Sequence, residues 1–258
     1  MKQLPKEDVV GFLKKAVLFS GLTAGFTVLL GSIQQSCPYI PAWVILPQLA
    51  PGLAAWLMLG VFRDQGSILR IPTSRTRGWK FLAAAGLPLV ITGLILLLVP
   101  LVTRPVETPP LSGTGFLILF SWMMVGAFAE ELGWRGYLQP LLATRWNGFL
   151  TSLLVGLLWG VWHVGNYQHG LVYMLFFVLS TIAYSLVITW LIHSVGWNVI
   201  LPWFFHLGVN LGFYVFSAVL TETAFMILNG LVWSAAAVFL VVVHRKIFFS
   251  SPAEKDIP

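Results

Sequence analysis

Long apolar runs without charge dominate this sequence and narrow the folds open to it. Eight of them can be read between charge clusters and Pro/Gly breaks, at about 16–34, 41–62, 80–101, 114–131, 148–165, 171–192, 197–216 and 224–243. Each is close to the roughly 20 residues that a helix needs to cross a bilayer, and none alternates like a strand of an outer-membrane barrel. Charged residues make up 9% of the chain, against about 25% in soluble domains. The sequence therefore predicts an all-α, polytopic membrane helix bundle with about eight transmembrane helices.

The basic residues indicate an orientation for this bundle. When the chain is threaded back and forth through the eight spans, all of the 15 Lys and Arg residues except Arg104 fall on one side. The positive-inside rule assigns that side, and both termini, to the cytoplasm. We expect a multi-pass protein of the bacterial cytoplasmic membrane, with the first span kept as an anchor and the lipid bilayer as a partner. We expect no nucleic-acid partner, because no basic patch is interleaved with aromatic residues.

Proline and glycine indicate how the chain is organised. The loop from Thr103 to Gly115 contains three prolines and reads as an extended connector on the far side of the membrane. It separates N-terminal membrane helices and connector (1–113) from a central unit (114–216), and a last helix with a cytoplasmic tail follows (217–258). Paired glycines four residues apart predict close helix packing: Gly21/Gly25, Gly156/Gly160 and Gly208/Gly212. Cys37 is the single cysteine, so no intrachain disulfide can form.

Two adjacent carboxylates, Glu130 and Glu131, lie where the fourth span is predicted. Burying an ionisable group at such a depth costs roughly 2.5 kcal/mol or more, so its default interpretation is functional. Glu131 and Arg135 are four residues apart, which also fits a structural ion pair on one helix face. The next titratable group within a span is His163, and the break at Asn147-Gly148 lies midway between it and Glu130. Two antiparallel helices turning there bring carboxylate and imidazole to one depth, where they can activate a water.

A further polar pair, His206 and Asn210, lies one helical turn apart in the seventh span. Such a pair can donate hydrogen bonds to an oxyanion, or the histidine can bind a metal. Residues 132–146 are polar enough to project beyond the membrane and open the site to the cytoplasm. Zinc-helix, nucleophile-elbow and phosphate-loop motifs are absent, and every lysine lies in a predicted cytoplasmic segment or at the edge of a span, which excludes a serine–lysine dyad. Any nucleophile must therefore be water.

At these residues the chain resembles the CPBP family of intramembrane endopeptidases, which includes CAAX prenyl endopeptidases and the Abi proteins related to bacteriocin immunity. The family pattern is Glu-Glu-x-x-x-Arg, then Phe-x-x-x-His, then His-x-x-x-Asn or Asp, on successive helices. The chain matches the first and third motifs in full and has Trp159 where the second has Phe. The resemblance covers roughly residues 115–215.

The resemblance implies a role for each matched residue. Glu130 with His163 activates a water for attack on a peptide carbonyl, and His206 with Asn210 stabilises the oxyanion. Three further residues support the site: Glu131, Arg135 and Trp159. The family has also been described as metal-dependent, and a zinc ion held by Glu130, His163 and His206 is the alternative. We expect the glutamate-dependent mechanism without a cofactor.

The sequence therefore predicts a hydrolase, an intramembrane protease that acts on membrane-associated peptide or protein substrates. CAAX-type cleavage, peptide maturation and bacteriocin self-immunity are the biological roles that the family suggests. Two other classes stay open: a non-proteolytic membrane immunity or scaffold protein, and a proton-coupled transporter that uses Glu130 and His163 as a relay. The transporter interpretation requires a broken helix or inverted repeat, which the sequence does not show.

Overall fold

The computed structural model describes residues 9–41, 44–62, 79–103 and 113–250, and every regular element in these ranges is helical. The α-helices are α1 (Val9–Ser36), α2 (Ala50–Phe62), α3 (Trp79–Leu98), α4 (Gly113–Glu131), α5 (Gln139–Ala143), α6 (Gly148–Trp162), α7 (Leu171–Val195), α8 (Ile200–Val215), α9 (Thr223–Val243) and α10 (Arg245–Phe249). Short 3-10 segments cover Leu46–Leu49, Val99–Leu101 and Val164–His169, and a π-helix covers Leu132–Leu138.

All eight predicted spans correspond to helices, but they differ in length. Five are long and apolar enough to cross a bilayer: Val9–Ser36, Lys80–Leu101, Gly113–Ala143, Leu171–His193 and Thr223–Val243. The other three, Leu46–Phe62, Gly148–Trp162 and Ile200–Val215, are shorter apolar helices. Lipid offers no partner to backbone polar groups, so apolar runs of this length are stable as helices. The predicted polytopic helical membrane bundle is confirmed, and the chain is an integral multi-pass membrane protein.

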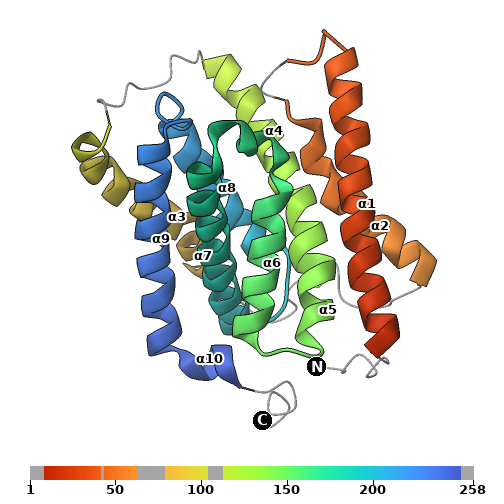
Figure 1. Ribbon diagram of the computed structural model, residues 1–258. Helices are drawn as coiled ribbons and strands as arrows, with labels where there is room; N and C mark the ends of the chain where they lie inside the picture. Colours follow the sequence, from red (N-terminus) through yellow and green to blue (C-terminus); the bar gives the residue numbers. More distant parts are fainter. Residues whose placement is uncertain (1–8, 42–43, 63–78, 104–112, 251–258) are drawn as a thin grey trace.

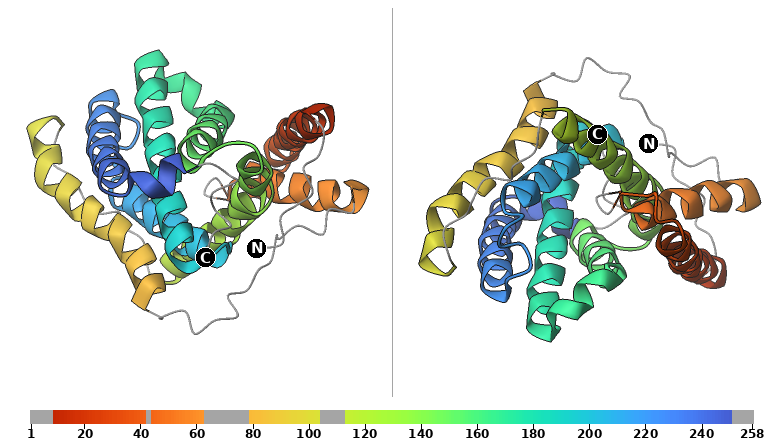
Figure 2. Two further views of the ribbon diagram at one scale, coloured as in Figure 1. Left: turned by 90° about the horizontal axis from the view of Figure 1, so that it is seen from below. Right: turned by 90° about the horizontal axis from the view of Figure 1, so that it is seen from above.

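The helices are arranged around α7. Helices α6 and α9 pack along α7, α8 contacts α4, and α3 covers α8 on the outside (Figure 1). Helices α1 and α2 pack on the other side of the bundle, where α2 contacts α4 (Figure 2). Helices from all three predicted segments therefore pack directly on one another. The division at residues 113 and 216 stays a prediction.

Glycine allows two of these helix pairs to approach closely. A Cβ atom built on Gly156 meets Cα of Ile182 at 2.5 Å, and one built on Gly208 meets the carbonyl oxygen of Ala85 at 2.8 Å. These contacts place α6 on α7 and α8 on α3, as the glycine pairs in both helices predict. The third pair is different, because no atom lies within 4 Å of a Cβ built on Gly21 or Gly25. That face of α1 makes no close helix contact among the described residues.

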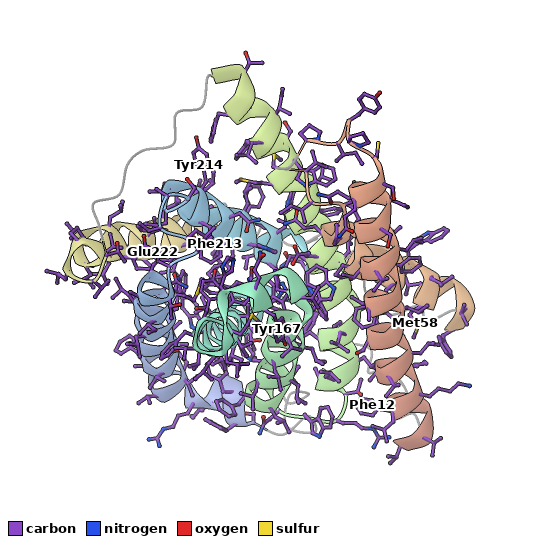
Figure 3. The ribbon with its side chains drawn as sticks, turned by 45° about the horizontal axis from the view of Figure 1, so that its top comes forward. Phe12, Met58, Tyr167, Phe213, Tyr214 and Glu222 are labelled. Carbon is purple, nitrogen blue, oxygen red and sulfur yellow. The ribbon has the colours of Figure 1, made fainter. Side chains whose placement is uncertain are left out.

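Local signals fix the ends of the central helices. Asn147 caps α6, because its side-chain oxygen accepts a hydrogen bond from the backbone N–H of Leu150 at 2.9 Å. Gly196 ends α7 with a φ of 94°, a conformation that glycine adopts without strain. Side chains fill the space between the helices, with Tyr214 and Glu222 toward one end and Phe12 toward the other (Figure 3). The predicted break at Asn147-Gly148 is thus the turn before α6.

The predicted basic side can be compared with the structure only in part. Three elements lie at the same end of the bundle: the start of α1, the turn between α5 and α6, and α10 (Figure 1). The basic residues Lys14, Arg145 and Arg245 belong to these elements. Residues 1–8, 63–78, 104–112 and 251–258 lie outside the described residues; they include both termini, most of the basic 63–80 loop and most of the predicted connector. The cytoplasmic assignment of both termini stays a prediction.

Candidate active site

The carboxylates Glu130 and Glu131 end α4, and a π-helical segment follows them directly. Such segments are rare and frequently occur at functional sites. A Cβ atom on Gly133 would collide with the backbone of Pro51, with the carbonyl carbon only 2.6 Å away, so α2 presses on this segment. The sequence analysis did not predict the π-helix. Gly133, Gly136 and Pro140, three poor helix formers within eight residues, are the signal that indicates an irregular helix here.

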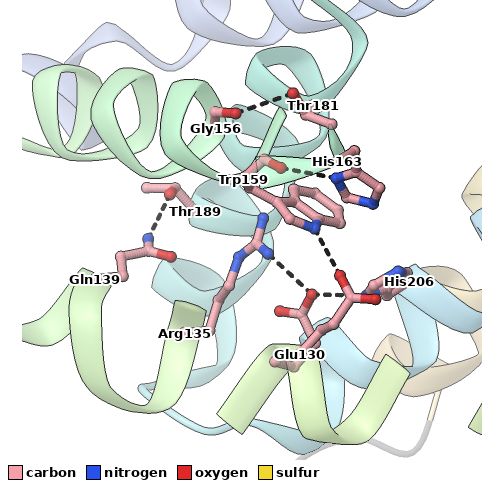
Figure 4. A network of polar contacts seen from close by, with 10 residues as sticks. Glu130, Arg135, Gln139, Gly156, Trp159, His163, Thr181, Thr189 and His206 are labelled. Atoms are coloured by element: carbon pink, nitrogen blue, oxygen red, sulfur yellow. Dashed lines mark hydrogen bonds and ion pairs between the residues drawn. The ribbon is translucent and has the colours of Figure 1, made fainter. Parts of the chain in front are cut away.

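The segment that follows is buried inside the bundle. Residues 132–146 are predicted to project beyond the membrane, and in the structure Arg135 and Gln139 are 0% and 1% exposed within the helix bundle. One nitrogen of each side chain has a partner inside the protein. Nε2 of Gln139 donates to Oγ1 of Thr189 at 2.7 Å, which ties α5 to α7 (Figure 4). The polar side chains of this segment are therefore used inside the protein, and its projection beyond the membrane stays a prediction.

Glu131 contacts two basic side chains through one oxygen. Its Oε1 accepts from Nη1 of Arg135 at 2.9 Å and lies 2.9 Å from Nδ1 of His206. The pair with Arg135 is the one that the four-residue spacing predicts. The contact with His206 was not predicted, because it joins α4 to α8 across 75 residues of sequence. Helix spacing carries no signal for such a contact.

Glu130 is bound by a different partner. The indole N–H of Trp159 donates to its Oε2 at 2.7 Å, and both side chains are buried. The position of the break midway between Glu130 and His163 predicts that these two side chains lie at the same depth. In the structure Trp159, one turn earlier in α6, is the residue that contacts Glu130. The reason is that α6 ends at Trp162 and His163 turns back along it. Nδ1 of His163 lies 2.8 Å from the carbonyl oxygen of Trp159.

Trp159 lies at the centre of the cluster (Figure 4). The guanidinium carbon of Arg135 is 4.3 Å from its ring centre, and the ring of His206 meets it edge-on at 5.0 Å. The His163 ring is further away, at 6.2 Å. The structure therefore brings together, around one indole, six of the seven residues that the sequence analysis selected: Glu130, Glu131, Arg135, Trp159, His163 and His206. The functional roles of these residues stay predictions.

Asn210, the seventh residue, lies apart from this network. It is one turn beyond His206 on α8 and partly buried. Among the described residues its side-chain amide forms no hydrogen bond, so it is free to bind another group. His163 also differs from the rest because it is partly exposed. Access to the cluster is therefore most open on the side of His163.

Several polar atoms of the cluster have no hydrogen-bond partner among the described residues. They are Oε1 of Glu130, Oε2 of Glu131, and Nε and Nη2 of Arg135. Buried polar groups are nearly always paired with protein or water, because leaving one unpaired costs about 1–3 kcal/mol. Unused donors and acceptors side by side thus define a site that water or a polar substrate can fill.

The zinc alternative requires Glu130, His163 and His206 to converge on one ion. Within the described ranges, no group of three or more His, Cys, Asp and Glu residues is placed to hold a metal ion. A catalytic zinc needs three protein ligands that converge. Nδ1 of His163 and of His206 already has a protein partner, which is also usual for a histidine that binds metal through its other nitrogen. The zinc alternative therefore stays a prediction.

The fold and this cluster define an integral membrane protein with a buried glutamate, arginine and histidine site. Comparison with known proteins agrees: residues 112–212 match the family described as Type II CAAX prenyl endopeptidase Rce1-like. This match includes the three motifs quoted from the sequence, so the resemblance found in the sequence is confirmed.

Individual relatives cover more of the chain. It is 30% identical over 147 residues to CAAX prenyl protease 2 of Methanococcus maripaludis, a match covering 53% of this chain and 53% of the relative. It is 30% identical over 185 residues to Lysostaphin resistance protein A of Staphylococcus epidermidis, covering 69% of this chain and 47% of the relative. The protein of that name from Staphylococcus aureus is 29% identical over 172 residues. The chain thus matches about half the length of these curated relatives.

Proposed function

We propose that this protein is an intramembrane endopeptidase that hydrolyses peptide bonds in membrane-associated peptide or protein substrates. The observation that carries the proposal is the state of Glu130. Its carboxylate is fully buried, one oxygen is held by Trp159, and Oε1 has no partner among the described residues. A buried carboxylate with a free oxygen is suited to accept a proton from water. The family match of the surrounding segment supports the same chemistry.

The reaction begins with a water between Glu130 and the substrate carbonyl. Oε1 of Glu130 takes one proton as the water oxygen bonds to the carbonyl carbon, and the carbonyl electron pair moves onto its oxygen. The tetrahedral oxyanion then collapses, the C–N bond breaks, and the leaving nitrogen takes the proton from Glu130. The products are one carboxylic acid and one amine, which then exchange a proton to give a carboxylate and an ammonium, and the glutamate returns to its starting form.

Both histidines have one nitrogen available for this reaction. Nδ1 of His163 carries hydrogen, because its partner is a carbonyl oxygen that can only accept. Its Nε2 therefore has a lone pair that can orient the attacking water. Nδ1 of His206 is bound to Glu131, which leaves its Nε2 free. We assign Nε2 of His206, which donates when the ring carries a hydrogen on both nitrogens, and the free amide of Asn210 to the oxyanion.

Glu131 and Arg135 support the site without touching the substrate. Glu131 forms an ion pair with Arg135 and contacts His206 of α8. The guanidinium of Arg135 stacks on Trp159. A histidine held by a carboxylate keeps one ring orientation, which a preorganised oxyanion site requires. No cofactor is assigned in this proposal, because a general base with two hydrogen-bond donors is sufficient for peptide hydrolysis.

The proposal is tested with Glu130→Gln in purified protein. The assay measures cleavage of a membrane-anchored peptide library in lipid vesicles, with prenylated and unprenylated members of the same sequences. Removing a general base costs about 10²- to 10⁴-fold, so turnover falls by that amount while folding is retained. Glu222→Gln, made at the start of α9, is the matched control and keeps full turnover.

Other outcomes distinguish the rival functions. Glu130→Gln protein that still confers its biological effect refutes the protease interpretation in favour of an immunity or scaffold role. Proton-coupled flux without cleavage favours a transporter. The relatives include a protein named CAAX prenyl protease 2 and proteins named Lysostaphin resistance protein A. Cleavage confined to prenylated peptides supports a CAAX-type substrate, and cleavage of both sets supports a broader role in peptide processing or self-immunity.

A further inference from the structure

We propose that Trp159 is a positioning residue that holds Oε2 of Glu130 and so leaves Oε1 as the oxygen that receives the proton from water. The inference rests on the proposed hydrolytic function and deepens it. A carboxylate has two equivalent oxygens, and an unrestrained side chain can turn either of them toward the water. The hydrogen bond from the indole removes that equivalence.

The contact has the geometry of a strong hydrogen bond. Nε1 of Trp159 lies 2.7 Å from Oε2, and Trp159 is 2% exposed beside a fully buried Glu130. Hydrogen bonds to ionised groups are shorter and about twice as strong as those between neutral groups. Among the described residues this is the one hydrogen bond that Glu130 receives, while Oε1 receives none. Oε2 thus anchors the carboxylate, and Oε1 is the oxygen left to accept a proton.

The indole is itself held on several sides. Arg135 stacks on its face at 4.3 Å, and His206 meets it edge-on at 5.0 Å. The helix that carries it approaches α7 closely, since a Cβ on Gly160 would lie 2.5 Å from Oγ1 of Thr181. Such packing prevents the ring from following a moving carboxylate. Glu130 must therefore adapt to Trp159, which is what positioning requires.

The backbone of Trp159 orients a second residue of the site. Its carbonyl oxygen accepts the hydrogen of Nδ1 in His163, so the other ring nitrogen is the acceptor. One residue thereby fixes the free oxygen of Glu130 and the free nitrogen of His163. The backbone contact persists in any variant at position 159, so a side-chain substitution tests the indole alone. Phenylalanine, the residue of the family pattern, keeps an aromatic ring and lacks the N–H.

The first test compares Trp159→Phe with Trp203→Phe. Trp203 also donates an indole hydrogen bond, to the carbonyl oxygen of Met124 at 2.8 Å, but it has no part in the site. A hydrogen bond to a charged group contributes about 1.5–3 kcal/mol, so Trp159→Phe is expected to lower kcat about 10- to 100-fold. KM stays unchanged, since the indole acts through Glu130. Trp203→Phe keeps both constants. An unchanged kcat in Trp159→Phe, or an equal fall in both variants, overturns the proposal.

The second test does not depend on activity. The protein is labelled with ¹⁵N at the tryptophan indoles in detergent micelles, and the Trp159 signal is assigned by its loss in Trp159→Phe. Glu130→Ala is expected to shift this indole resonance upfield and to leave that of Trp203 in place. If the Trp159 indole resonance does not shift in Glu130→Ala, the hydrogen bond between Trp159 and Glu130 is refuted. Wild-type protein that cleaves no substrate refutes the proposed function, and the resonance still decides whether Trp159 holds Glu130.

Discussion

Replacing Glu131 by glutamine tests the ion-pair network that supports the site. Oε1 of Glu131 contacts Nη1 of Arg135 and Nδ1 of His206, each at 2.9 Å, and both Glu131 and Arg135 are 0% exposed. Glutamine keeps the shape of the side chain and removes its charge. Breaking a buried pair by neutralising one partner costs about 3–5 kcal/mol, since it leaves the other charge uncompensated. The unfolded fraction then rises by roughly two to four orders of magnitude.

The measurement is a denaturant titration of the purified protein in detergent micelles. The free energy of unfolding of Glu131→Gln is compared with that of the wild type and of Glu222→Gln. The control removes a partly buried carboxylate at the start of α9, outside the site, and is expected to lose clearly less stability than Glu131→Gln. An equal loss of unfolding free energy in both variants shows that the buried ion pair contributes no more to stability than the control carboxylate.

A double-mutant cycle separates the pair from its surroundings. Arg135→Met alone leaves Glu131 buried without its arginine, whereas the double variant removes both charges. Contacting residues usually show coupling of about 0.5–3 kcal/mol, so the double variant is expected to lose less than the sum of the single losses by at least about 1 kcal/mol. Strictly additive losses would refute the reasoning that Glu131 and Arg135 act as one unit.

Two further predictions concern the π-helical segment and the metal question. Gly133→Ala, whose Cβ collides with Pro51, is expected to destabilise the protein by about 1–3 kcal/mol in the same titration; Gly25→Ala, with no atom within 4 Å, is the control and equal losses contradict the packing argument. Treatment with a chelator is expected to leave cleavage unchanged, and wild type and His163→Ala are both expected to carry far less than one metal ion per chain. Activity that is lost with the metal and returns with zinc contradicts the proposed mechanism.

Most of the helices could be predicted because the membrane leaves the chain few alternatives. An uncharged apolar run has to form a helix in lipid, and charge clusters and Pro/Gly breaks mark where it ends. The start of α6 after Asn147 and the extent of α9 follow from such signals. The three short helices could not be distinguished from full spans. In the fifth run, for example, Val164 and Gly165 are apolar and small but belong to a 3-10 segment.

The site was predicted as a set of residues but not as a set of contacts. Spacing along one helix predicts the pair of Glu131 and Arg135, because both side chains share a face. Contacts between helices depend on register, which the sequence fixes only if both helices are regular. The π-helix after Glu131 and the early end of α6 break that condition. Two regular helices of equal length would place His163 at the depth of Glu130. In the structure the side chain of Trp159 contacts Glu130 instead.

The two adjacent glutamates differ because their partners come from different helices. Oε1 of Glu131 is held by Arg135 and His206, two groups that carry or can carry positive charge. Oε2 of Glu130 is held by the neutral indole of Trp159. Both glutamates keep one oxygen without a partner among the described residues, so the difference between them is the charge of the groups that hold the other oxygen. A carboxylate paired with cations gives up its negative charge less readily than one held by a neutral donor. In the proposed mechanism Glu130 is therefore the base of the pair, and this assignment depends on partners from α6 and α8 rather than on either glutamate's own neighbours in sequence.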